Sequence, residues 1–405
     1  MQLDNNAIKT LFITSDASAM AGVGPCLADA LEHIDRNLIN PIVICPWEAQ
    51  GAATILPRLE ALALPVYTRN LGKWMPSPDR WGLSHLLSFV STLKERVWAL
   101  SSLIEREGIE VVYSNGLPCI DGALAALLSH RPHIWHLHEA IRNNPDLRQY
   151  IPAWLVQRLV ARLSTTIIVN SSYLAREFDS AGRLKPLRVV HNGVNVSQFS
   201  QLLVSEEALS VRQEFELSPD TLIVLAVGTA NPRKGYDILI KAAASVLSKQ
   251  SGVCFLVAGS ELTDYSKYLR DLAIDLGLGQ AFRFLGPRQD IPRLMAACDI
   301  FVHCARQETF GRALIEAMAA GKPVVSTCCG GPEEIVEDGE TGYLVPVDNS
   351  VVFAERIIEL LQSPHRRNNF GKAGQSRAIK YFSVTHYASS IQKIILATAG
   401  HRKSL

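Results

Sequence analysis

Short apolar segments rich in β-branched residues recur along the chain, and stretches with helical periodicity separate them. Six lie in the first half, at 9–15, 41–45, 110–114, 133–139, 165–170 and 187–192, and six in the second, at 221–229, 253–259, 281–286, 299–304, 323–327 and 342–346. Nearly continuous apolar strands that alternate with helices are typical of parallel sheets covered on both faces. The pattern therefore predicts an α/β protein of doubly wound sheets.

The chain of 405 residues is long enough for two such domains. The strand at 187–192 ends in the turn-forming pair Asn192-Gly193, and a polar stretch follows it. We predict a first Rossmann-like domain over 1–200, a second over 201–382, and a C-terminal amphipathic helix over 383–405 that can pack back on the first. Ligands of such sheets bind beyond the carboxyl ends of strands, so candidate site residues should follow strands.

Composition narrows the function classes. Hydrophobic residues make up 48% and charged residues 20%, which is ordinary for a folded globular protein. The formal net charge is +1, so no overall field favours nucleic acid as a partner. The chain shows neither a secretory leader nor an apolar run long enough to span a bilayer, and we expect a cytoplasmic protein. Its eight cysteines lack a C-x-x-C spacing, which favours reduced and mostly buried thiols.

A pair of glutamates provides the most informative motif. Glu308 follows the strand at 299–304, Gly311 comes next, and Glu316 lies within the apolar helical run "RALIEAMAA". The first turn of that helix offers amides and a dipole that favour an anion. A buried carboxylate needs partners, which a ligand with hydroxyl groups can supply. The alternative is that Glu316 lies on an exposed edge of the helix or pairs with an arginine.

A second loop adds positive charge. The segment "GTANPRKG" directly follows the strand at 221–229 and places Arg233 and Lys234 before a helix start. Two cations and free amides can hold a pyrophosphate. An isolated loop of this kind is more often a solvated turn, but its combination with Glu308 and Glu316 favours a phosphate site.

In the first half, "AMAGVGPCL" contains Gly22 and Gly24 after a strand, where the backbone can approach a ligand or simply form a tight turn. The strand "HIWHLHEA" places His136 and His138 on one face. A zinc site would need further ligands that we do not find. His138 stands at the carboxyl end of that strand, either as a catalytic residue or as a hydrogen-bonded structural histidine.

The segment "FLGPRQDIPRLMAACDIFVHCARQETFGRALIEAMAAGKPVVSTCCGGPEEIVEDGETGYLVP" resembles the donor-binding half of glycosyltransferase family 4, retaining enzymes of the GT-B fold. The likeness is strong over roughly 220–350 and weaker in "AGVG", "HLHE" and "HNGVN". The Glu-x7-Glu motif of the family falls on Glu308 and Glu316. The resemblance implies two Rossmann-like domains facing each other across a cleft, with the donor held by the second.

By this resemblance, Glu308 binds hydroxyls of the donor sugar, Glu316 holds the ribose, and Arg233 and Lys234 neutralise the departing diphosphate. The implied catalytic residues are His138, Glu308 and Lys234. The implied donor-binding residues are Gly22, Gly24, Arg233, Lys234, Gly286, Arg288, Glu308, Thr309, Phe310, Gly311, Leu314 and Glu316. No metal or other cofactor is expected, because fixed cations and amides can offset the charge of the leaving group.

The sequence departs from the family in three places. Thr229 stands where many members have an arginine, His303-Cys304 replaces the usual Pro-Ser, and Asn195 replaces a common aspartate. None of these changes removes a central group. The change at Thr229 shifts the neutralisation of the phosphates onto Arg233 and Lys234.

The implied activity is retaining transfer of a sugar, guessed to come from UDP-glucose or a similar donor, to a hydroxyl of a glycan or a lipid-linked acceptor. A basic amphipathic stretch with Arg158 and Arg162 can rest on the inner face of a membrane, although a core helix with a solvated edge has the same pattern. The alternatives are a nucleotide-sugar epimerase of the same architecture, a catalytically silent nucleotide-sugar-binding subunit and an NAD-dependent oxidoreductase. The broken glycine motif disfavours the oxidoreductase.

Overall fold

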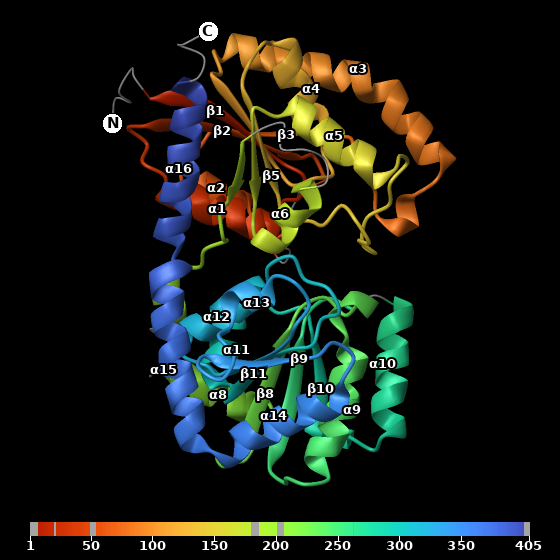
Figure 1. The fold of residues 1–405 in the computed structure, drawn as a ribbon, viewed down its shortest axis with the longest axis vertical. Coiled ribbons are helices and arrows are strands. Elements are labelled where there is room, and N and C mark those ends of the chain that lie inside the picture. The colour runs from red at the N-terminus through yellow and green to blue at the C-terminus, as the bar shows by residue number, and fades with distance from the viewer. Residues whose placement is uncertain are drawn as a thin grey trace. The chain divides into compact units, whose positions relative to one another are not determined.

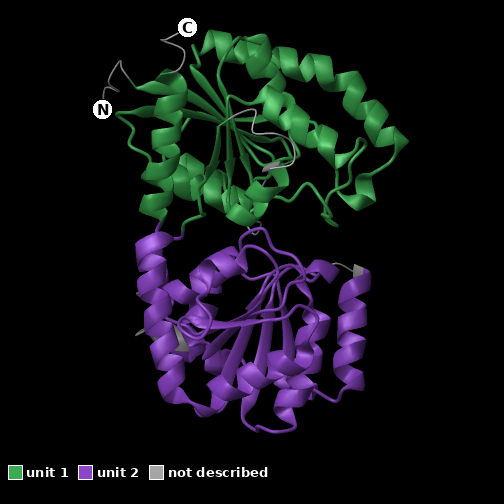
Figure 2. Cartoon of the chain, in the orientation of Figure 1, with its two compact units in different colours: residues 1–193, 384–405 green, residues 194–383 purple. Residues whose placement is uncertain are grey.

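The computed structural model describes residues 7–19, 22–48, 54–179, 186–200, 206–261 and 263–400. The chain divides into two compact units, shown in Figure 2: unit 1 contains 1–193 and 384–405, and unit 2 contains 194–383. The predicted boundary after residue 200 therefore falls inside unit 2. Of the C-terminal segment predicted at 383–405, residues 401–405 lie outside the described part.

Unit 1 is built on a parallel sheet of seven strands in the order β3-β2-β1-β4-β5-β6-β7 (Figure 1). Its strands are β1 (Ile8–Thr14), β2 (Ile39–Pro46), β3 (Val66–Arg69), β4 (Val111–Asn115), β5 (His133–Leu137), β6 (Thr166–Val169) and β7 (Leu187–Val189). Its helices are α1 (Val23–His33), α2 (Leu56–Ala61), the 3-10 turn η1 (Pro78–Arg80), α3 (Leu83–Arg106), α4 (Asp121–Leu128), α5 (Ala153–Leu163), α6 (Ser172–Asp179) and α16 (Val384–Gly400).

Unit 2 has a parallel sheet of six strands in the order β10-β9-β8-β11-β12-β13. Its strands are β8 (Leu222–Val227), β9 (Val253–Ala258), β10 (Phe282–Gly286), β11 (Ile300–His303), β12 (Val324–Thr327) and β13 (Gly342–Val345). Its helices are α7 (Val196–Ser200), α8 (Glu206–Glu214), η3 (Pro232–Lys234), α9 (Tyr236–Leu247), α10 (Thr263–Asp275), η4 (Gly279–Ala281), α11 (Ile291–Ala297), α12 (Arg312–Ala319), α13 (Pro332–Ile335), α14 (Ser350–Gln362) and α15 (Pro364–Tyr381).

The two doubly wound parallel sheets are as predicted. Central strands are apolar on both faces because helices cover both; β9, for example, is buried along its whole length. Strand β3 was not predicted. It lies at the edge of its sheet, spans four residues, and ends in the exposed pair Thr68 and Arg69, so it lacks the long apolar run of a central strand.

Helix α16 belongs to unit 1, although it ends the described chain. Tyr387, Ala388, Ile391 and Ile395 are buried in one core cluster with residues of α1 and β1, such as Phe12. These four positions repeat at helical spacing, which gives α16 a continuous apolar face. The C-terminal helix thus completes the first hydrophobic core.

In both sheets the strand order reverses next to the first strand. The reversal falls between β1 and β4 in unit 1 and between β8 and β11 in unit 2. Loops leaving the two strands at such a point diverge to opposite faces of the sheet and leave a crevice at its carboxyl end. The loops after β8 and β11 carry the two charged motifs of the sequence.

Candidate donor-binding site

The loop after β8 carries the cations Arg233 and Lys234, and a side-chain hydrogen bond within the loop fixes its turn. The side chain of Asn231 accepts a hydrogen bond from the backbone N–H of Lys234 (3.1 Å), which closes the turn η3. Gly235 follows with φ +65°, and a Cβ there would lie 2.1 Å from the carbonyl oxygen of Cys304. Only glycine therefore lets this turn pass so close to the end of β11. The packing sets Arg233 and Lys234 beside the loop that carries Glu308.

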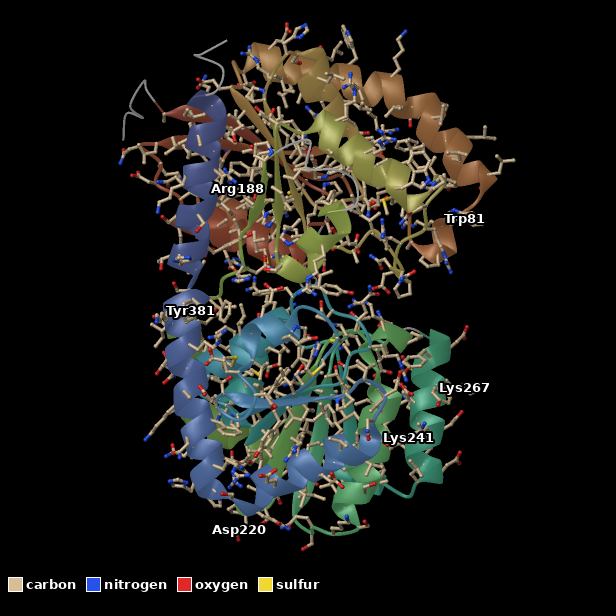
Figure 3. All side chains as sticks on the ribbon, in the orientation of Figure 1. Trp81, Arg188, Asp220, Lys241, Lys267 and Tyr381 are labelled. Atoms are coloured by element: carbon tan, nitrogen blue, oxygen red, sulfur yellow. The ribbon has the colours of Figure 1, made fainter. Side chains whose placement is uncertain are left out.

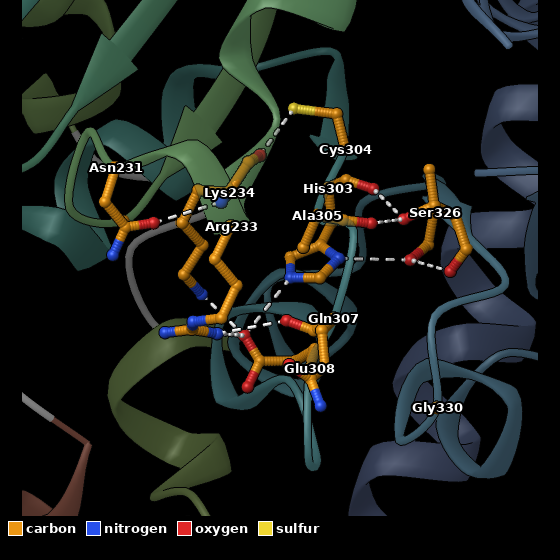
Figure 4. A network of polar contacts seen from close by, with 12 residues as sticks. Asn231, Arg233, Lys234, His303, Cys304, Ala305, Gln307, Glu308, Ser326 and Gly330 are labelled. Atoms are coloured by element: carbon orange, nitrogen blue, oxygen red, sulfur yellow. Dashed lines mark hydrogen bonds and ion pairs between the residues drawn. The ribbon is translucent and has the colours of Figure 1, made fainter. Parts of the chain in front are cut away.

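Glu308 is the centre of the site (Figure 4). Its Oε2 lies 2.5 Å from Nζ of Lys234 and 3.5 Å from Nη1 of Arg233. The glutamate side chain is 13% exposed. Burial opposes its charge, but Lys234, His303 and Arg233 together hold the pKa of Glu308 well below its ordinary value of 4.5. An ionised carboxylate is thus fixed between two cations.

His303 is a member of this cluster that the sequence did not identify as functional. It is the last residue of β11, is 4% exposed, and places its Nε2 3.6 Å from Oε2 of Glu308. Its Nδ1 lies 3.3 Å from Oγ of Ser326. Burial lowers the pKa of His303, with the nearby Lys234 acting in the same direction. Its position at a strand end next to the glutamate loop was the available signal.

Glu316 has an arginine partner. Its Oε1 accepts a hydrogen bond from Nε of Arg312 at 2.8 Å, and its side chain is 14% exposed. The four-residue spacing brings both side chains to the same face of α12, while Leu314, Ile315 and Ala317 face the core. Of the two interpretations of the sequence, the structure contains the arginine pair. Arg312 itself was missed, although its spacing to Glu316 is a recognisable helix signal.

The residues between the glutamates have different roles. Phe310 and Leu314 are only 1% and 0% exposed, and their side chains pack in the core of unit 2. Gly311 has φ +107° and directly precedes α12. A Cβ at Gly331 would lie 2.3 Å from Cα of Phe310, so the 330–331 turn packs directly on this segment. Phe310 and Gly311 can therefore offer a ligand only their backbone groups, whereas Thr309 is half-buried.

Gly286 and Arg288 lie at the end of the edge strand β10. Gly286 has φ +69°, and its carbonyl accepts a hydrogen bond from the N–H of Gly259 (2.8 Å). Arg288 forms ion pairs with Asp290 (2.7 Å) and Glu214 (2.8 Å), and these partners raise its pKa. Two carboxylates thus already balance the positive charge of the Arg288 guanidinium. The structure does not bring Arg288 into the described contacts of Glu308.

In unit 1, the two glycines of the first loop differ. A Cβ at Gly22 would meet nothing within 4 Å, whereas one at Gly24 would lie 2.6 Å from the carbonyl oxygen of Ser18. The packing of the loop thus explains why residue 24 is a glycine.

His138 follows β5 and is 7% exposed, and its Nε2 lies 2.9 Å from Oδ1 of Asn115. Asn115 was not predicted, because nothing in the sequence pairs it with the histidine.

All eight cysteines are free, and seven are buried, as the sequence predicts. Among the described residues, no group of three or more His, Cys, Asp or Glu side chains could hold a metal ion. In the same part of the chain, no helix is long and apolar enough to cross a membrane.

Comparison with known proteins places this geometry in a family. Residues 209–377 match the sequence profile described as glycosyl transferases group 1, and residues 21–198 match that of Glycosyltransferase Family 4. A D-inositol 3-phosphate glycosyltransferase of Mycobacteroides abscessus is 35% identical over 56% of this chain, a match that spans about half (49%) of that protein. A lipopolysaccharide core biosynthesis glycosyltransferase, LpsE of Rhizobium meliloti, is 29% identical over 55% of this chain and 61% of its own length.

Solved structures extend the likeness to both units. Anabaena HepE in complex with UDP and glucose is 26% identical, with a TM-score of 0.79, over 96% of this chain and 100% of that one. A sucrose-phosphate synthase of Thermosynechococcus elongatus shares the fold at 19% identity, with a TM-score of 0.73, over 96% of this chain and 98% of that one. The fold is that of the GT-B glycosyltransferases, as predicted, and the chain belongs to glycosyltransferase family 4.

Proposed function

We propose that this protein transfers a sugar from a nucleotide diphosphate sugar, UDP-glucose or a close relative, to a hydroxyl of a glycan or lipid-linked acceptor, with retention at the anomeric carbon. The observation that carries the proposal is the ionised Glu308 held between Lys234 and Arg233 at the carboxyl ends of β8 and β11. Support for the nucleotide comes from Anabaena HepE, which was crystallised with UDP, with UDP-glucose, and with UDP and glucose.

In this proposal the cluster has two tasks. The carboxylate of Glu308 accepts hydrogen bonds from hydroxyls of the donor sugar, because an ionised acid is a strong acceptor. Lys234 and Arg233, which are 17% and 21% exposed, are accessible to the diphosphate next to it. The first amides of α12 add positive potential for the same oxygens. Glu316, oriented by Arg312, accepts from the ribose.

Transfer needs stabilisation of charge at both ends of the breaking bond. The sugar becomes positively charged and the departing diphosphate negatively charged, and groups fixed before the reaction stabilise both without reorganising. One such donor is typically worth about 2.7 to 4 kcal/mol of barrier. Two cations and the helix amides then take the place of a divalent metal, so we propose metal-independent transfer.

Retention is proposed to follow from attack on the same face of the sugar. A double displacement would need a free carboxylate on the opposite face. Glu308 is a poor nucleophile in this arrangement, because its charge is committed to Lys234 at 2.5 Å. His138 of unit 1 is the proposed hydrogen-bonding group near the reacting centre.

We further propose that unit 1 lies against an anionic membrane when the acceptor is lipid-linked. Four apolar residues on one face of helix α3 are largely exposed: Leu83 (71%), Leu87 (61%), Val90 (57%) and Trp98 (67%). Trp81, labelled in Figure 3, is 52% exposed just before this helix. Exposed apolar rows of this kind mark interaction surfaces, and Arg158 and Arg162, exposed on α5, supply positive charge.

The test is incubation of the purified protein with a panel of radiolabelled nucleotide sugars, glycan acceptors and lipid-linked acceptors, with and without EDTA. We expect one UDP-sugar to yield a labelled glycoside and free UDP in equal amounts, with and without the chelator. Conversion of the donor to another sugar without an acceptor would instead identify an epimerase. Donor binding without turnover across all acceptors would contradict the proposed activity.

A further inference from the structure

Arg306 lies two residues before Glu308, on the loop that follows β11, and forms hydrogen bonds with the loop that follows β8. Its backbone N–H donates to the carbonyl oxygen of Arg233 at 2.7 Å. Its side chain contacts the same turn, because Nη1 donates to the carbonyl oxygen of Pro232 at 2.8 Å. Main chain and side chain of Arg306 thus hold two successive carbonyl groups of η3, directly before Lys234.

The guanidinium of Arg306 also binds two carboxylates. Nη1 and Nη2 lie 2.9 and 2.7 Å from the two carboxylate oxygens of Asp237, in the first turn of α9, and Nε lies 2.7 Å from Oδ1 of Asp348. A paired arrangement of this kind fixes the direction of the guanidinium as well as its distance. The side chain of Asp237 is 12% exposed, whereas that of Asp348 is 58% exposed. The more buried partner, Asp237, therefore determines where the guanidinium lies.

Asp237 is itself held from a second side. Its Oδ1 accepts a hydrogen bond from the hydroxyl of Tyr265, on α10, at 2.8 Å. Burial opposes the charge of Asp237, but hydrogen bonds from Arg306 and Tyr265 hold the pKa of its carboxyl below the ordinary value of 3.8. An ionised aspartate that belongs to α9 and contacts α10 thus anchors Arg306, and Arg306 anchors the turn η3.

This attachment differs from the hydrogen bond that shapes the turn. Asn231 closes η3 from within, through the backbone N–H of Lys234. The contacts of Arg306 instead join the closed turn to the loop that carries Glu308. Nζ of Lys234 lies 2.5 Å from Oε2 of Glu308 (Figure 4), so a shift of the turn by about 1 Å would lengthen this contact beyond a normal charge-assisted hydrogen bond.

We propose that Arg306 is a positioning residue of the transfer reaction: it holds the turn η3 so that Lys234 stays beside Glu308 and meets the diphosphate of the donor. This inference rests on the proposed function. Arg306 acts through Lys234, because each nitrogen of its own guanidinium already has a protein partner. Arg233 depends less on this support, since its Nη1 lies 3.1 Å from the carbonyl oxygen of Gln307.

Turnover of a nucleotide sugar by the full chain tests this role. Arg306→Gln removes the paired contact with Asp237, and kcat should fall at least about tenfold, because a displacement of about 1 Å can cost about a hundredfold in rate. Arg306→Lys keeps a cation but cannot form the paired contact, so it should also lower kcat. It is the second variant if Arg306→Gln does not fold. A wild-type kcat in either folded variant would overturn the inference.

Arg212 offers a matched control at the opposite end of the same two strands. Its Nη2 lies 3.3 Å from Oδ2 of Asp299, which directly precedes β11, and its Nη1 donates to the carbonyl oxygen of Thr221, which directly precedes β8. The side chain of Arg212 is 19% exposed and that of Arg306 is 32% exposed. Arg212→Gln should keep the wild-type kcat, even where it lowers the melting temperature. An equal fall in kcat for Arg212→Gln and Arg306→Gln would indicate a general loss of stability and overturn the positioning role.

A double-mutant cycle distinguishes action through Lys234 from action elsewhere in the protein. In the Lys234→Ala background, Arg306→Gln should lower kcat by less than about twofold, because the group that Arg306 positions is already missing. Losses of rate that multiply in the double variant would show that Arg306 acts independently of Lys234, and the inference would be wrong.

Failure of this inference can be told apart from failure of the proposed function. If the proposed function is wrong, the wild type forms no glycoside from any donor. If only the role of Arg306 is wrong, the wild type forms the glycoside, and Arg306→Gln either forms it at the same rate or loses rate independently of Lys234.

Discussion

At the scale of single residues, the charge of Glu308 governs how the site depends on pH. The folded pKa of Glu308 lies below its ordinary value of 4.5, so its ion pairs stabilise the fold above that pH and are lost as pH falls through the lowered folded pKa. We expect Glu308→Gln to destabilise unit 2 by about 3 kcal/mol at pH 7, because two cations lose their partner. Urea unfolding from pH 3 to pH 8 should show that the difference in unfolding free energy between the wild type and Glu308→Gln shrinks toward acid pH. A difference independent of pH would contradict the lowered pKa of Glu308.

The cations of the loop after β8 carry the second prediction. Lys234→Ala and Glu308→Ala should each reduce turnover at least about tenfold, on the order of 1.4 kcal/mol of barrier, since the diphosphate loses a fixed charge or the sugar loses its acceptor. Lys241, on α9 and exposed, is the control, and Lys241→Ala should keep the wild-type rate. Unaltered rates for the first two variants would remove them from the mechanism.

Glu316 carries the third prediction. A ligand that binds only the folded state stabilises it, by about 2.7 kcal/mol at a hundred times its Kd. We expect UDP to raise the melting temperature of the wild type and Glu316→Ala to blunt this shift, because the ribose loses its acceptor. Glu355→Ala, at an exposed position of α14, should shift like the wild type. Equal shifts for wild type and Glu316→Ala would remove this carboxylate from the UDP site.

At the scale of elements, the first half of α3 is less buried than the second. Its buried residues, among them Leu100, Leu103 and Ile104, belong to its second half, while the exposed apolar row begins at Leu83. We expect Leu87→Glu to weaken sedimentation with vesicles rich in anionic lipid, because it places a carboxylate in that row. Ser88→Glu, which is exposed next to Leu87 but lies on another face of the helix, controls for charge alone. Equal sedimentation of the wild type and Leu87→Glu would remove α3 from any membrane surface.

At the scale of the whole molecule, the two units have separate cores, and α16 belongs to the first. A chain ending at Ser383 loses the buried Tyr387, Ile391 and Ile395 from unit 1 but nothing from unit 2. Calorimetry of the truncated chain should therefore show that the unfolding transition of unit 1 is lost or moves to a much lower temperature. UDP should still raise the melting temperature of unit 2. Loss of the UDP effect in the truncated chain would contradict a donor site confined to unit 2.

The chain itself predicts a large part of this molecule. Alternating apolar strands and helices determine the two parallel sheets, since strands buried on both faces cannot be polar on either. Positions directly after strands locate the loops of the site, because parallel strands bring their carboxyl ends to one edge of the sheet. The loops with Lys234 and Glu308 were found in this way, and the structure places their side chains 2.5 Å apart.

What only the tertiary structure decided is the partner of each polar group. Arg288 turns to Glu214, 74 residues away, and the amide of Asn115 faces His138, 23 residues away. Such pairings depend on loop geometry and on which face of an element is buried, and no sequence period encodes either. The sequence determines where charge and hydrogen-bonding capacity occur along the chain. The fold decides which of these groups satisfy each other and which are left for a ligand, because a buried polar group takes whichever partner the packing brings within reach.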